Sequence, residues 1–233
     1  MNLLEPTRRA FELLAAGDPR LLEAIWLSFW TSLAAIALIA PPSIALAFLL
    51  AKRRFPAQRA LVVLVQALLS FPTVVIGLLI YLLLSRRGPL GFLELLFTPS
   101  AIIAGYMMIA FPILVVFTIS AVQGADPRIY ETARCLGASR RQASLTTLWE
   151  VRFGIGAAVV NGFGRVISEV GAAIMVGGNI EGLTRNIPTA IALETSKGDL
   201  PLALGLGIIL ISLVVVVNAA AYGVKEAAQR RYG

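Results

Sequence analysis

Histidine is absent from the 233 residues of this chain, and cysteine occurs only once, at Cys135. Without histidine, the chain lacks the commonest general base and metal ligand of proteins, and a single cysteine forms neither an internal disulfide nor a multi-cysteine metal site. Charged residues are scarce as well, at 14% of the sequence. These shortages argue against an enzyme, and we expect no catalytic residue, no metal site and no cofactor in this chain.

Apolar residues, in contrast, make up 58% of the chain, and its mean hydropathy is +0.84. A soluble protein of this size could not bury so much apolar surface, whereas a bilayer could. Five runs with almost no charge reach the roughly 20 residues that a helix needs to cross the hydrocarbon layer. They are continuously apolar rather than alternating, which indicates helices and not barrel strands. The sequence therefore predicts an all-α membrane protein with about five transmembrane helices, at about 24–51, 60–85, 98–124, 153–178 and 201–224.

Short segments flank this predicted transmembrane domain, which covers 21–224. Residues 1–20 mix leucine and phenylalanine with charged side chains and have no long apolar core. This composition is unlike a secretory signal and is typical of an amphipathic helix, predicted at 2–16, that lies on membrane lipid. Residues 225–233 are polar and form a predicted cytoplasmic tail.

The positive residues indicate how the chain is oriented, because cytoplasmic connections of membrane proteins are rich in lysine and arginine. Seven positive residues fall on the side of the N-terminus. Twelve fall on the opposite side: Lys52, Arg53, Arg54, Arg59, Arg128, Arg134, Arg140, Arg141, Arg152, Lys225, Arg230 and Arg231. We therefore expect the N-terminus outside and the C-terminus in the cytoplasm. This topology accounts for the net charge of +7 better than a nucleic-acid partner does.

Small residues and prolines lie within the apolar runs. Gly154, Ala158 and Gly162 recur every four residues, so they share one helix face and allow another helix to approach closely. Prolines in the first three runs predict helix kinks whose freed carbonyl groups are satisfied by neighbouring helices. These prolines are Pro41, Pro42, Pro72 and Pro112.

The connection at 126–152 is not a plain linker. Asp126 and Pro127 are suited to start a helix, and Gly137 can adopt the left-handed conformation that ends one. Ser139 can cap a second helix that runs to about residue 149. The segment is therefore predicted to form two short helices that offer a rigid projection to a cytoplasmic partner.

Within this connection, Glu131-Thr132-Ala133, three residues and then Gly137 resemble the EAA signature of permeases in ATP-binding-cassette (ABC) importers. Residues 147–150, Thr-Leu-Trp-Glu, stand where that family has an Ile-x-Leu-Pro-like ending. A second stretch, 164–199, is similar to the corresponding part of tungstate-type permeases, which are related to molybdate and sulfate permeases.

The resemblance implies the type I (MetI-like) fold of ABC importer permeases and a place in the prokaryotic inner membrane. It also implies a pathway for an oxyanion, with tungstate as the leading candidate and molybdate or sulfate as alternatives. The implied partners are a dimeric ABC ATPase subunit, an extracytoplasmic substrate-binding protein and a second copy of the chain. The ATPase would contact the coupling residues of the EAA loop, which are Glu131, Ala133, Leu136, Gly137, Ala138 and Ser139.

Two charges interrupt the fourth apolar run. Arg165 and Glu169 lie four residues apart, so they share a helix face, and charges in a span are costly unless they are paired or hydrated. They are predicted either to pair with each other or to face the translocation path. In the following external segment, the charged residues are candidate docking points for the binding protein or members of a solvated loop. They are Glu181, Arg185, Lys197 and Asp199.

Two other functional classes compete with this interpretation. An ion-coupled secondary transporter usually has two related halves and broken helices, and no internal repeat is visible here. A membrane-embedded enzyme needs clustered catalytic groups, for which Arg165 and Glu169 alone are a poor basis. No Gly-x4-Gly-Lys-Ser/Thr sequence occurs, so we expect ATP hydrolysis to take place in a partner chain.

Overall fold

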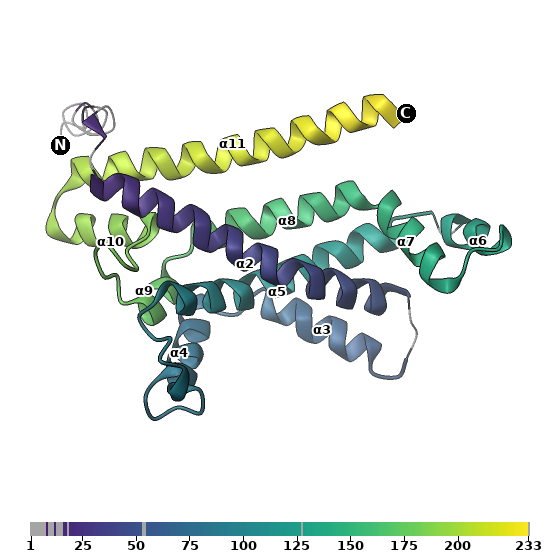
Figure 1. The fold of residues 1–233 in the computed structure, drawn as a ribbon, viewed down its shortest axis with the longest axis horizontal. Coiled ribbons are helices and arrows are strands. Elements are labelled where there is room, and N and C mark those ends of the chain that lie inside the picture. Colours follow the sequence, from purple (N-terminus) through teal and green to yellow (C-terminus); the bar gives the residue numbers. More distant parts are fainter. Residues whose placement is uncertain are drawn as a thin grey trace.

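The computed structural model describes residues 8, 12, 16–17, 19–52, 55–126 and 128–232, with the backbone alone at 224, 225 and 227–232. The predicted amphipathic helix at 2–16 lies almost entirely outside these residues. Helices dominate the described chain, and no strand occurs in it. The longest of them run along one long axis (Figure 1). In order, they are α2 (Pro19–Lys52), α3 (Gln58–Leu68), α4 (Thr73–Leu84), the 3-10 helix η1 (Gly91–Leu93), α5 (Pro99–Gln123), α6 (Arg128–Cys135), α7 (Arg140–Glu150), α8 (Arg152–Ile167), α9 (Gly171–Gly177), α10 (Ile187–Lys197) and α11 (Leu200–Tyr232).

Three of these helices, α2, α5 and α11, are each long and apolar enough to cross a membrane. The pairs α3 with α4 and α8 with α9 reach that length only together, which gives up to five spans. The two helices of the first pair meet at an angle of 100° and those of the second at 61°. The second apolar run therefore bends next to Pro72, where a kink is predicted, whereas the fourth run bends at a break that no proline in its sequence predicts.

Pro72 accounts for the break between α3 and α4. It lies at the N-cap of α4 with φ −61°. An amide at this position donates no hydrogen bond within the helix, so the helix loses nothing when proline lacks the amide proton. Proline also disfavours the helical conformation of the residue before it, so α3 ends upstream of this point. Pro41, Pro42 and Pro112, by contrast, are accommodated inside continuous helices.

At the break between α8 and α9, a side-chain carboxylate takes the place of a backbone carbonyl as a hydrogen-bond acceptor. The Glu169 carboxylate accepts a hydrogen bond from the backbone amide of Ala172 at 3.2 Å and so caps the start of α9. Gly171 lies against α4, and a Cβ atom at this position would be 2.7 Å from Cγ2 of Val74. The bend therefore depends on a capping carboxylate and on a glycine that lets α4 approach.

Helix α5 is at the centre of the bundle. It buries side chains all around its circumference, which is typical of a helix enclosed by others, and packs against α2, α8, α9 and α4. Ile102, Tyr106 and Leu114 are among its fully buried residues. Two smaller apolar clusters join the beginning of α2 to α10 and α11, and the end of α2 to α3.

The predicted close-packing face of α8 is confirmed. A Cβ atom at Gly154 would lie 2.7 Å from Cβ of Ala121 in α5, and one at Gly162 would lie 3.2 Å from Cδ1 of Ile36 in α2. Ala158, between them, is fully buried. The small residues therefore bring α8 against both long helices.

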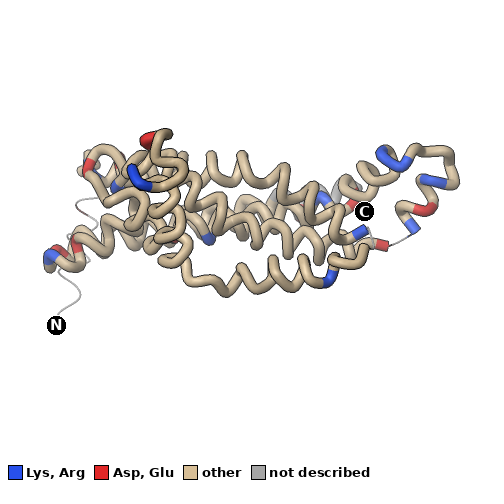
Figure 2. Tube along the Cα trace, turned by 90° about the horizontal axis from the view of Figure 1, so that it is seen from below, with Lys and Arg blue, Asp and Glu red and all other residues tan. Residues whose placement is uncertain are grey.

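Charged residues lie mainly toward the two ends of the long axis, and few lie in the middle of the molecule (Figure 2). The helices α6 and α7 and the end of α11 lie toward one end, whereas the start of α2 and α10 lie at the other (Figure 1). Helix α11 continues past residue 224 to Tyr232, so the backbone of the predicted tail is largely helical. This separation of charge is the one that a membrane-spanning bundle requires.

Replacing Gly77 by alanine tests the contact between the two bent pairs. The added Cβ would lie 2.8 Å from Cα of Ala172 and 2.9 Å from Cβ of Met175, so we expect Gly77→Ala to lower the stability by about 1–3 kcal/mol. Gly207→Ala in α11 is the control, because nothing lies within 4 Å of its Cβ position. Thermal unfolding of the purified protein in detergent would measure both, and equal midpoints would contradict the close contact.

Candidate functional site

The connection at 126–152 is a helical hairpin made of α6 and α7, which pack against each other. Gly137 has φ +89°, in the left-handed region that favours glycine. Its amide donates to the carbonyl of Arg134 at 3.1 Å, and the amide of Ala138 donates to the carbonyl of Ala133 at 3.0 Å. This pair of bonds is a Schellman motif. The predicted helix end at Gly137 is confirmed.

A capping box starts the second helix of the hairpin. The amide of Gln142 donates to Oγ of Ser139 at 3.3 Å, and the amide of Ser139 donates to Oε1 of Gln142 at 2.8 Å. The predicted cap at Ser139 is therefore confirmed. Val151 separates α7 from α8, so the unusual ending at 147–150 is the last turn of α7.

The hairpin projects from the end of the bundle (Figure 1). No described residue of α6 is buried, and the apolar side chain of Leu136 is 83% exposed. Helix α7, in contrast, is anchored by Ala143 and Thr147, both with no exposed surface. Leu136 therefore lies exposed at the tip of a hairpin whose two helices are capped next to it.

The predicted pairing of Arg165 with Glu169 is present in the structure. Their Nη1 and Oε2 atoms are 2.6 Å apart, and Glu169 is buried whereas 43% of the arginine side chain is exposed. Arg165 belongs to an exposed face of α8 that sequence reasoning missed, although its helical spacing of small and polar residues was a visible signal. This α8 stripe consists of Ala157, Asn161, Arg165 and Ser168.

A buried polar cluster at the opposite end from the hairpin was also missed. Asn186 caps α10, since its Oδ1 accepts from the amide of Thr189 at 3.0 Å. Its Nδ2 donates to the hydroxyl of Tyr106 in α5 at 2.7 Å. The amide of Ile187 donates to Oγ of Ser28 in α2 at 2.7 Å. The cluster therefore joins α10 to two long helices, and only the cap, Asn-x-x-Thr with an intervening proline, left a signal in the sequence.

The four charges predicted for docking all have contacts within the chain. Glu181 pairs with Arg185 at 2.9 Å, and Lys197 pairs with Glu194 at 2.8 Å. Asp199 accepts from the amide of Leu202 at 3.2 Å and caps α11.

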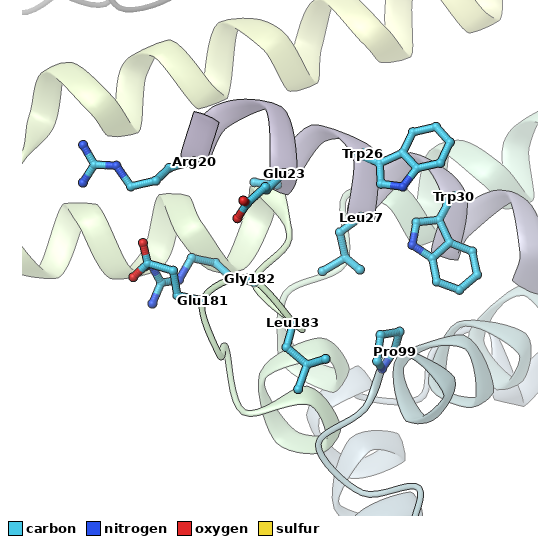
Figure 3. A pocket seen from close by; sticks show the side chains of 11 residues that line it. Arg20, Glu23, Trp26, Leu27, Trp30, Pro99, Glu181, Gly182 and Leu183 are labelled. Atoms are coloured by element: carbon cyan, nitrogen blue, oxygen red, sulfur yellow. The ribbon is translucent and has the colours of Figure 1, made fainter. Parts of the chain in front are cut away.

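The Glu181–Arg185 pair lies at a cavity of about 280 Å³ that is also lined by charged and aromatic side chains of α2 (Figure 3). These are Arg20, Glu23, Trp26 and Trp30.

Residues 43–233 match the family described as binding-protein-dependent transport system inner membrane component, and the chain belongs to that family. It is 38% identical to the tungstate uptake system permease protein TupB of Peptoclostridium acidaminophilum, over 96% of this chain and 98% of that protein. It is 39% identical to a probable anion ABC transporter permease of Haloferax volcanii, over 82% and 85%. The molybdenum transport system permease ModB of Escherichia coli is 33% identical, over 76% and 82%.

Solved structures of ABC importers share the fold. A bacterial importer of the acidic polysaccharide alginate matches with a TM-score of 0.66 at 20% identity, covering 88% of this chain and 80% of that one. The MetNI methionine transporter matches with a TM-score of 0.66 at 15% identity, covering 89% and 93%. The predicted fold class, an all-α permease of the type I importer fold with about five spans, is confirmed, and the chain is a multi-pass inner-membrane protein.

Asn186→Ala would remove both the cap of α10 and the donor to the buried Tyr106 hydroxyl. We expect a loss of stability of about 2–4 kcal/mol, the sum of a lost cap and an unsatisfied buried group. Asn218→Ala is the matched control, because this exposed amide bonds only to the carbonyl of Val214 in its own helix. Thermal unfolding in detergent would measure both, and a double-mutant cycle with Tyr106→Phe would isolate the hydrogen bond. Equal effects of the two asparagine variants would show that the contacts of Asn186 with α10 and Tyr106 do not stabilise the protein.

Proposed function

We propose that this chain is the membrane-spanning permease of an oxyanion importer, with tungstate as the first candidate for its substrate. The proposal rests chiefly on the exposed, doubly capped hairpin at the positive end of a type I permease fold. Relatives named for tungstate, anion and molybdenum transport support the class of substrate. Selection between tungstate, molybdate and sulfate is assigned to a separate extracytoplasmic binding protein.

The hairpin is proposed to couple transport to ATP hydrolysis in a separate ATPase subunit. Leu136 supplies an apolar contact at the tip, and the turn at Gly137 and the cap at Ser139 hold the two helices in a fixed relation. Glu131, Ala133 and Ala138 complete this surface. Because both helix ends are capped, movement of the ATPase would be transmitted as a rigid-body displacement.

The exposed face of α8 is proposed to line the translocation path between two copies of the chain. An arginine on the outside of a spanning helix is costly in lipid, so the α8 stripe needs water or a polar partner. Arg165 offers a positive charge to a passing dianion, while Glu169 is already engaged by Arg165 and by the amide of Ala172. The glutamate therefore positions the arginine and caps α9 at the same time.

The opposite end of the bundle is proposed to face outside and to receive the binding protein. This end carries the start of α2, and the end with the hairpin and the finish of α11 is assigned to the cytoplasm by its excess of positive residues. Glu181 and Arg185 border the cavity shown in Figure 3, and Lys197 and Asp199 lie at the adjoining end of α10. These charges form the proposed docking surface.

Reconstitution in proteoliposomes tests the proposed function. The permease, its ATPase and its binding protein are expected to import tungstate only when ATP is supplied on the hairpin side. Molybdate and sulfate added in excess would rank the competing oxyanions. Uptake that proceeds without the ATPase, or driven by an ion gradient alone, would refute the importer proposal and favour a secondary transporter.

Leu136→Ser tests the coupling contact without disturbing the fold, since this side chain is almost fully exposed. Loss of a buried leucine contact at the interface would weaken ATPase binding by about tenfold or more. The control is Phe92→Ser, an equally apolar and 77% exposed position in η1. Binding of the ATPase to both variants would be measured in detergent, and unchanged affinity for Leu136→Ser would remove this residue from the interface.

Variants of Arg165 distinguish a role in the path from a role in structure. Arg165→Gln leaves the buried Glu169 without its ion partner, so it would reduce stability and uptake together. The double variant Arg165→Gln/Glu169→Gln removes both charges and should recover much of the stability. We expect its oxyanion uptake to stay at least about tenfold below wild type, because the attractive charge is lost. Arg165→Lys should transport, and wild-type uptake by the double variant would rule out the path role.

A further inference from the structure

A second, larger cavity lies at the hairpin end and is not part of the proposed path or coupling surface. It has a volume of about 1060 Å³, is open on one side, and is lined by the last turns of α2 and by both hairpin helices. Lys52 comes from α2, Arg134 from α6, and Arg140 and Arg141 from α7. Three elements that are separate in sequence thus bring four positive charges to one cavity.

No negative charge compensates for them among the residues that line the cavity. Arg134 donates to the carbonyl of Ala138 at 2.5 Å, and Lys52 lies over the ring of Tyr130 with its Nζ 5.6 Å from the centroid. Both of these partners are neutral. Within the described part of the chain, no carboxylate pairs with Arg140 or Arg141. Like charges that are gathered without an anion repel one another, so an anion that enters this cavity is stabilised.

The part of the cavity wall that α2 supplies before Lys52 is apolar. Phe48 and Leu49 line it from α2, which is one of the helices long enough to span the membrane. The apolar side chain of Leu49 is 38% exposed. A free inorganic anion would leave such a wall uncovered, whereas a phospholipid places its phosphate at the cations and its acyl chain along the helix.

We infer that this cavity binds the phosphate group of an anionic phospholipid of the inner leaflet. Arginine guanidinium groups match phosphate oxygens with paired hydrogen bonds, and four cations at the membrane boundary favour a lipid with net negative charge over a zwitterionic one. The lipid bridges the end of α2 to both helices of the hairpin. On the proposed function, it also fixes the orientation of the coupling hairpin relative to the spans.

Lipid binding is measured on the full-length permease alone, so its result does not depend on whether the chain couples to an ATPase. Native mass spectrometry would follow the binding of short-chain phosphatidylglycerol and phosphatidylcholine to the detergent-purified protein. We expect preference for phosphatidylglycerol, and binding about thirtyfold weaker in Arg140→Gln/Arg141→Gln. The matched control is Arg86→Gln/Arg87→Gln, which removes the same charge from the turn after α4, outside the lining of this cavity. Lys52→Gln, on the α2 wall, is a second variant with an expected loss of about fivefold.

Three outcomes overturn the inference. Equal binding of the two lipids would show that the cations are not the recognition element. Displacement of phosphatidylglycerol by inorganic phosphate at equal concentration would identify a free oxyanion as the ligand. Unchanged lipid binding in Arg140→Gln/Arg141→Gln would remove these arginines from the lipid site, and loss of ATPase binding by the same variant would assign them to a protein interface instead.

Discussion

Every backbone group in the low-dielectric interior of this bundle needs a hydrogen-bond partner from the protein, because lipid supplies none. Where the helices break, a few side chains meet this requirement. Glu169 receives the amide of Ala172 at the start of α9, and Thr184 donates to the carbonyl of Gly177 at its end. Asn186 and Ser28 satisfy the first amides of α10. The path of the chain from α8 to α11 therefore depends on a small set of buried polar residues.

The molecule consists of a closely packed helical core and a hairpin that projects from it. Around the central helix α5, glycines at the α8 and α4 contacts allow the backbones to lie close together, and the polar cluster at Asn186 ties the far end to α2 and α5. The hairpin, in contrast, is held mainly by its own caps and by two buried residues of α7. A rigid projection on a rigid bundle is the arrangement through which a partner can move the spans as units.

Several features could be predicted from the sequence because they depend on neighbours in the chain. The apolar runs predicted helices, and Gly137 and Ser139 predicted where the hairpin helices end and begin, since left-handed glycine and capping serine act within one turn. The pairing of Arg165 with Glu169 was visible because residues four apart share a helix face. The coupling, docking and path roles of the candidate residues stay predictions, since they concern partners outside the chain.

The amino-acid sequence by itself determined the class of the protein: its apolarity requires a bilayer, its uninterrupted runs require helices, and its positive connections indicate an orientation. Only the tertiary structure decided that the fourth run bends, that Asn186 meets Tyr106 across 80 residues, and that three separated elements form one positive cavity. Periodicity reports which side chains avoid water, but not which distant backbone or side chain each of them meets. Those contacts arise only when α4, α9 and α10 pack against the long helices.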